Sequence, residues 1–142
     1  MSGIIASQSE ETAVSIVQSI ASLINSEGRK SYKYKSHLTS AFNFINECKT
    51  CAENLNAKLA STFGKSLNLV LMVLSNFTDS WDDRRIKATC STFSDVLIAN
   101  SFMTELNLNR NFIGDKGTSS LTKALMVNKF LVFFRAVVRF HR

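Results

Sequence analysis

The stretch from Met103 to Leu131 constrains the fold more than any other part of the sequence. Within it, Leu106 and Leu108 alternate with polar residues, which is the period-two pattern of a short strand with one buried face. Gly114 follows in a turn, and apolar residues then recur at helical spacing as far as Asn128. The sequence therefore predicts a strand, a turn and a helix in one short unit.

The pattern of this unit resembles a leucine-rich repeat of the longer ribonuclease-inhibitor type. The matching residues are Met103-x-x-Leu106-x-Leu108-x-x-Asn111-x-Ile113-Gly114, and the resemblance covers about one and a half repeats, from Thr92 to Phe134. In that family the leucines point into a curved core, the asparagine side chain binds backbone groups of the neighbouring turn, and the helix closes the outer wall. The resemblance therefore implies repeat-core roles for the following residues: Leu106, Leu108, Asn111, Ile113, Leu121 and Leu125.

The polar residues between the strand leucines form the candidate binding surface. In the repeat family these positions face the concave side, where partners are usually met, so the resemblance places Glu105, Asn107 and Asn109 there. The period-two pattern alone indicates only that they are exposed to solvent. We therefore expect a non-enzymatic protein-protein interaction module or a fragment of a longer leucine-rich-repeat protein. The predicted partner is another protein.

A second copy of the repeat can be traced at a fixed offset. The segment VLIANSFM begins at Val96 and ALMVNKFL begins at Ala124, so the offset is 124 minus 96, or 28 residues. The upstream copy is a helix half only, and in the downstream copy Arg139 replaces Asn111. About three such repeats are normally needed to cover their stacking faces. Three alternatives therefore stay open: the preceding helices cover them, the chain is a piece of a longer repeat protein, or it self-associates through the open repeat edge.

Apolar residues at helical spacing fill the first half of the chain. They predict one helix over residues 10–28 and a second over residues 36–64, with Gly64 as its end. A third apolar segment covers residues 67–77, and acidic residues at 79–83 supply capping groups for the next helix. Because the sequence has no proline, long uninterrupted helices are permitted.

The predicted fold class is mainly α. We expect an N-terminal helical bundle over residues 1–80, followed by an incomplete leucine-rich-repeat (α/β) unit over residues 81–142 that packs on it. The two parts form either separate domains or one single domain, since 142 residues suffice for one compact core.

Basic residues raise an alternative function. The chain has 17 lysines and arginines against 11 acidic residues, a net charge of +6. One basic cluster is interleaved with tyrosines, a combination that can bind phosphates and stack on bases; it comprises Arg29, Lys30, Lys33 and Lys35. Three arginines lie in the C-terminal tail: Arg135, Arg139 and Arg142. They share one side if the tail is helical, whereas the repeat register predicts a strand at its start. The alternative is thus a basic amphipathic protein that binds an anionic membrane surface or nucleic acid.

No motif in the sequence indicates catalysis, a cofactor or a metal. Gly114 and Gly117 lack the lysine of a phosphate-binding loop. Cys48 and Cys51 have the spacing of a metal or redox pair, but a structural zinc needs four ligands and no second pair follows. We therefore expect the cysteines to be free thiols, buried or half-buried, and the protein not to be an enzyme.

The N-terminus predicts the compartment. Residues 1–9 lack the basic start and the long apolar core of a secretory signal. The longest apolar run, residues 67–74, is too short to cross a bilayer. A cytoplasmic protein is expected.

Overall fold

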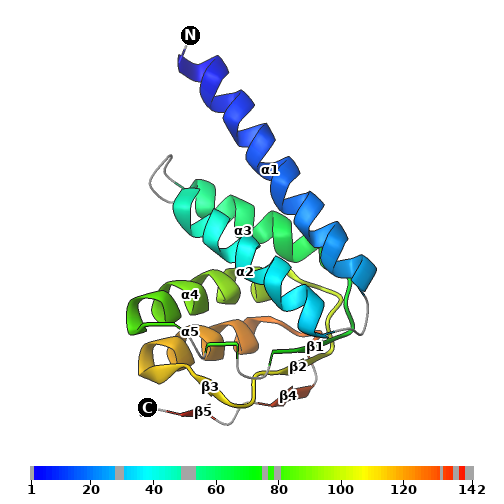
Figure 1. Ribbon diagram of the computed structural model, residues 1–142, viewed down its shortest axis with the longest axis vertical. Coiled ribbons are helices and arrows are strands. Elements are labelled where there is room, and N and C mark those ends of the chain that lie inside the picture. Colours follow the sequence, from blue (N-terminus) through cyan, green and yellow to red (C-terminus); the bar gives the residue numbers. More distant parts are fainter. Residues whose placement is uncertain are drawn as a thin grey trace.

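The computed structural model describes residues 2–27, 31–48, 54–74, 77–78, 81–131, 133–135 and 138–139. The helices in these ranges are α1 (Ser2–Glu27), α2 (Ser31–Cys48), α3 (Leu55–Ser66), α4 (Asp83–Ala99) and α5 (Gly114–Val127) (Figure 1). The strands are β1 (Leu71–Val73), β2 (Glu105–Asn107), β3 (Asn111–Phe112), β4 (Phe133–Arg135) and β5 (Val138–Arg139). The fold is mainly helical, as predicted.

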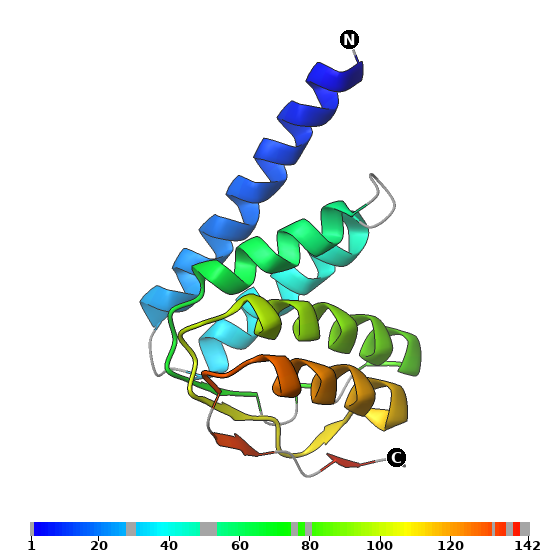
Figure 2. The ribbon, with the colours of Figure 1, turned by 180° about the vertical axis from the view of Figure 1, so that it is seen from behind.

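The first three helices form a bundle-like layer. Helix α1 packs against both α2 and α3, and its N-terminal end projects beyond them (Figures 1 and 2). Apolar side chains at helical spacing, such as Val17 and Ile24 of α1 and Leu38 of α2, are fully buried. Phe42 and Phe63 meet edge to face, with their ring centroids 6.3 Å apart. Hydrophobic burial therefore holds α1, α2 and α3 together.

The prediction of one continuous helix over residues 36–64 is wrong. Helix α2 ends at Cys48 and α3 begins at Leu55, directly after Asn54, whose backbone is left-handed with φ of 68°. Asparagine tolerates this conformation better than most residues. The apolar spacing does not reveal the break because both helices bury their apolar faces in the same core.

Parallel strands form the second part of the fold. The strand order is β1-β2-β4, with Met72 opposite Leu106 and Leu106 opposite Phe134. Met72 and Leu106 are buried, because alternate strand residues point to the helices. Strands β3 and β5 pair separately, also in parallel. A helix thus connects each pair of neighbouring strands in the first sheet: α4 lies between β1 and β2, and α5 between β2 and β4.

Two segments differ from expectation in this sheet. The apolar segment at residues 67–77 contributes Leu67, Leu69, Met72 and Leu74 to the core, but it also includes the unpredicted strand β1, which pairs with β2 across the proposed boundary at residue 80. In the tail, the helical alternative that aligned Arg135 and Arg139 is wrong, because these residues end β4 and β5. Pairing with β2 and β3 gives backbone hydrogen-bond partners to one side of each tail strand.

Helices α3, α4 and α5 stack side by side over the sheet (Figure 2). Asp82 caps α4 by accepting a hydrogen bond from the Arg85 backbone N–H at 2.8 Å, as the acidic residues at 79–83 predicted. Gly64 lies within α3, not at its end, and a methyl group there would be 2.3 Å from the Val96 carbonyl oxygen of α4. Its lack of a side chain allows the two helices to approach closely.

Two buried asparagines tie the helix ends together. The Asn100 Nδ2 group donates to the carbonyls of Gly64 and Leu67 at 2.8 and 3.0 Å, and its Oδ1 accepts from the Phe102 and Met103 backbone N–H groups. Asn100 follows α4, so it binds this helix to the end of α3.

Asn128 repeats this arrangement one unit later, at the offset of 28 residues (128 minus 100). Its Nδ2 group donates to the carbonyls of Leu97 and Asn100 at 2.7 and 3.1 Å. Its Oδ1 accepts from the Phe130 and Leu131 backbone N–H groups at 2.7 and 2.9 Å. The end of α5 is therefore bound to the end of α4 by the same chemistry.

We predict that Asn128→Ala lowers the free energy of unfolding by at least about 2 kcal/mol, because buried carbonyl and amide groups lose their partners. Urea unfolding followed by the fluorescence of buried Trp81 measures this change. Asn43→Ala, at an exposed position on α2, is the control and should change stability by less than about 0.5 kcal/mol. Equal losses in both variants would contradict a special role for Asn128.

Candidate functional site

The outward side of strands β1 and β2 is the candidate site, and we call it the open sheet face. It consists of Leu71 and Val73 of β1 with Glu105 and Asn107 of β2. Leu71 lies in register with Glu105, and Val73 with Asn107. Their neighbours Met72 and Leu106 point inward and are buried. The open sheet face is therefore built by the alternation of two short strands on a fixed core.

Apolar side chains dominate the β1 side of this face. Leu71 is 44% exposed, and Val70 just before it is 54% exposed. The Val70 carbonyl accepts hydrogen bonds from the Thr104 and Glu105 backbone N–H groups at 2.9 and 3.0 Å, which fixes it beside β2. Leu71 thus stands in solvent on a rigid strand, in register with the Glu105 carboxylate, and Val70 is exposed just before that strand.

The predicted binding residues differ in their surroundings. Glu105 is exposed, whereas Asn107 and Asn109 are half-buried. The Asn107 Oδ1 accepts a hydrogen bond from the Asn109 backbone N–H at 2.9 Å, so this side chain also shapes the turn after β2. Glu105 is the member of the set whose side chain is most accessible to a partner.

Residues predicted to form the repeat core lie beneath this face. Those buried there are Leu106, Leu108, Asn111, Ile113 and Leu121, while Leu125 is half-buried. The Asn111 Nδ2 group donates to the Leu74 and Leu108 carbonyls at 2.9 and 2.8 Å. Its Oδ1 accepts from the Thr78 backbone N–H at 2.9 Å. Asn111 therefore joins the turns that follow β1 and β2 and holds the two strands in register.

The basic residues of the alternative function are dispersed over several elements. Lys33 and Lys35 belong to α2, and Lys35 is half-buried, while Arg135 and Arg139 belong to β4 and β5. Arg135 lies in register with Asn107, and Arg139 with Phe112, so they sit on different sheets. The remaining members lie outside the described residues: Arg29, Lys30 and Arg142. The described members therefore belong to three different elements, α2, β4 and β5.

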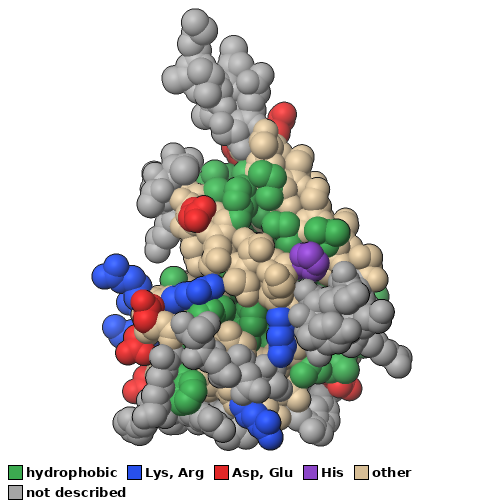
Figure 3. All heavy atoms as spheres, in the orientation of Figure 1, with side chains coloured by type: hydrophobic (Ala, Val, Ile, Leu, Met, Phe, Trp, Pro, Cys, Tyr) green, Lys and Arg blue, Asp and Glu red, His purple; other side chains and the backbone are tan. Residues whose placement is uncertain are grey.

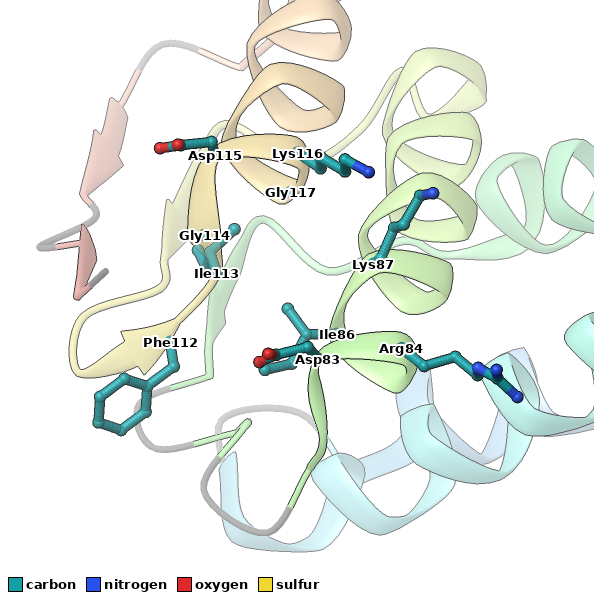
Figure 4. Close-up of a pocket in the computed structure, with 10 residues that line it drawn as sticks. All are labelled: Asp83, Arg84, Ile86, Lys87, Phe112, Ile113, Gly114, Asp115, Lys116 and Gly117. Atoms are coloured by element: carbon teal, nitrogen blue, oxygen red, sulfur yellow. The ribbon is translucent and has the colours of Figure 1, made fainter. Parts of the chain in front are cut away.

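A pocket of about 440 Å³ opens between the first turns of α4 and α5 (Figure 4). Its charged lining residues are Asp83, Arg84, Lys87, Asp115 and Lys116. Arg84 points away from the space between the turns, and each of these side chains is exposed. Basic and acidic side chains mix at this end of the two helices (Figure 3). The pocket therefore offers neither a single sign of charge nor a buried polar group that would select a ligand.

The cysteines that the structure describes are buried thiols, as expected. Cys48 lies at the end of α2 and Cys90 within α4, while Cys51 falls outside the described residues. Burial raises the pKa of Cys90 to about 12, so its thiol stays protonated at neutral pH. No group of three His, Cys, Asp or Glu side chains that could hold a metal occurs in the part of the chain that the structure describes.

We predict that Cys90 resists alkylation in the folded protein, because the thiolate is the reactive form. Iodoacetamide treatment followed by peptide mass spectrometry should find Cys90 unmodified in buffer and modified in urea.

The folded state holds the Cys90 thiol proton more tightly than the unfolded state, so the Cys90 contribution to stability is lost as pH rises from 9.0 toward about 12. Cys90→Ala should remove this fall in the free energy of unfolding between pH 9.0 and about 12. The same fall in the variant would contradict the assignment to Cys90.

Comparisons with known proteins assign the chain to no family. No protein-family model matches the chain, and neither the curated proteins nor the solved structures yield a significant match. Across the described residues, no helix is long and apolar enough to traverse a bilayer.

Proposed function

We propose that this protein is a non-enzymatic protein-binding module, in which a leucine-rich-repeat-like unit presents the open sheet face to another protein. The observation that carries the proposal is the exposure of Leu71 beside Glu105 on adjacent, register-matched strands. The parallel strands, the helix between each pair and the hydrogen bonds of Asn111 support the repeat-like interpretation.

Exposed aliphatic groups on a rigid strand face favour a protein partner. Burying Leu71 under a partner would gain roughly 25 cal/mol per Å² of apolar surface removed from water. Little conformational entropy opposes this gain, because β1 is already fixed by pairing with β2. Glu105 adds a carboxylate opposite Leu71, so the partner segment should present an apolar residue flanked by lysine or arginine.

We predict that Leu71→Asp weakens partner capture at least tenfold, because it places a charge where an apolar side chain would be buried. A partner captured by the wild-type chain is identified, purified and titrated against both proteins by calorimetry. Leu23→Asp is the matched control, since Leu23 is 49% exposed but lies on α1. Both variants should retain the helical circular dichroism of the wild type. Equal affinity of Leu71→Asp and wild type would refute the assignment of this face.

The salt dependence of binding separates this proposal from the anionic-ligand alternative. A packed apolar contact should change little between about 50 and 200 mM salt, whereas binding through several phosphate contacts falls by orders of magnitude. The same calorimetric titration at both ionic strengths measures the difference. A steep loss with salt would instead favour binding through the basic cluster around Lys33 and the arginine-bearing tail.

A further inference from the structure

Helices α3, α4 and α5 all end at the same side of the stack, where the chain turns toward the strands (Figure 2). We call this side the turn edge, and it consists of residues 65–70, 98–104 and 126–131. The Asn100 side chain donates to the Leu67 carbonyl at 3.0 Å, and the Asn128 side chain donates to the Asn100 carbonyl at 3.1 Å. Each of the three segments therefore contacts the next.

Large apolar side chains stand in solvent along the turn edge. Val70, Phe102, Val127 and Phe130 are each between 50% and 54% exposed. Phe102 and Phe130 each follow a buried asparagine by two residues, so they occupy equivalent places on neighbouring turns. Neighbouring exposed apolar groups of this size are typical of a binding surface for protein or membrane.

The described part of the tail leads away from this edge. Strand β4 pairs in parallel with β2, and β5 pairs in parallel with β3, which follows β2 in the chain. After Leu131, β4 and β5 therefore run from the turn edge toward the opposite end of the sheet.

Buried asparagines supply hydrogen-bond partners to the backbone of the turn edge. The Asn100 Oδ1 accepts from the Phe102 backbone N–H at 3.0 Å, and the Asn128 Oδ1 accepts from the Phe130 backbone N–H at 2.7 Å. The exposed rings thus sit on backbone N–H groups that are already bonded within the protein. Hydrocarbon offers no hydrogen bonds, so a turn enters it at low cost only when the protein supplies such partners. This property favours a lipid surface as the occupant.

The charges of the turn edge have one sign. Its three segments contain Lys65 and Lys129, which are both exposed, and no acidic residue. Glu105 follows the second segment but belongs to the open sheet face. Lysine can lay its aliphatic stem along apolar groups while its ammonium group reaches a phosphate headgroup. The turn edge is therefore complementary to a bilayer whose surface is negatively charged.

We propose that the turn edge binds the surface of an anionic lipid bilayer, with the Phe102 and Phe130 rings inserted below the headgroups and Lys65 and Lys129 at the level of the phosphates. A few inserted side chains and two cations give reversible binding at the surface. The turn edge shares no residue with the open sheet face, so this inference does not depend on the proposed protein-binding function.

Co-sedimentation of the purified chain with lipid vesicles tests the binding. The wild type should pellet with vesicles made of equal parts of phosphatidylcholine and phosphatidylserine. It should bind vesicles of phosphatidylcholine alone at least about tenfold more weakly, because the negative surface charge is missing. A wild type that stays in the supernatant with both kinds of vesicle would overturn the proposal, and equal binding to both would overturn the choice of an anionic surface.

Substitution of one ring tests the surface that makes the contact. Phe102→Ser should weaken binding to the mixed vesicles at least about tenfold, because less apolar area leaves water. Ile16→Ser is the matched control and should change binding less than about twofold, since Ile16 is 38% exposed but lies on α1, outside the turn edge. Both variants should keep the helical circular dichroism of the wild type. Equal binding by the two variants would contradict insertion of Phe102.

Tryptophan fluorescence tests insertion directly. Trp81 is the only tryptophan in the sequence and is buried, so the wild type supplies the background emission. Emission of Phe102→Trp should shift to shorter wavelength when mixed vesicles are added, whereas emission of Ile16→Trp should not. Vesicle binding without a shift in Phe102→Trp would mean that another surface meets the bilayer, and it would overturn the proposal.

Sedimentation velocity without lipid distinguishes a bilayer from a second copy of the chain as the occupant. The wild type should sediment as a monomer of 15.8 kDa. A wild-type dimer that Phe102→Ser dissociates would instead identify the turn edge as an interface between copies, and the proposal would fall.

Discussion

The side-chain amides of Asn100 and Asn128 are the interaction on which the second part of the fold depends. The last carbonyls of a helix have no partner within that helix, and burying them unpaired is costly. Each asparagine donates hydrogen bonds to two carbonyls at or just after the end of the previous helix in the stack. It also accepts hydrogen bonds from two backbone N–H groups of its own turn. One residue per unit thereby fixes the helix end, the turn and the start of the next strand.

The helical layer is attached by related chemistry. Asn25 of α1 donates to the Ser66 carbonyl at 2.9 Å and accepts from the Asn68 backbone N–H at 2.9 Å. It thus donates to a carbonyl at the end of α3 much as Asn128 donates to carbonyls at the end of α4. This bond and the packing of α1 and α2 on α3 cover one stacking face that a short repeat unit would otherwise expose. The first of the three alternatives left open by the sequence therefore accounts for that face.

The unit from β2 to α5 could be predicted because its signals are local. Leu106 and Leu108 alternate over a few residues, and the offset between Asn100 and Asn128 is visible by direct comparison. Strand β1 gives no such signal, because it is three residues long and its exposed Leu71 is as apolar as its buried Met72. It is a strand because it pairs with β2. This pairing is not visible in a local pattern, because the paired residues Leu71 and Glu105 lie 34 positions apart in the sequence (105 minus 71).

The residues of the candidate site likewise divide into those with a local signal in the sequence and those without one. Glu105 could be identified from its place between inward leucines. Val70 and Leu71 could not, because exposure of an apolar residue depends on what the rest of the chain leaves uncovered. Aligning Met72 with Leu106 would have revealed them, since both are buried strand centres. The interruption between α2 and α3 also escaped local reasoning, because the apolar seam continues on both sides of it.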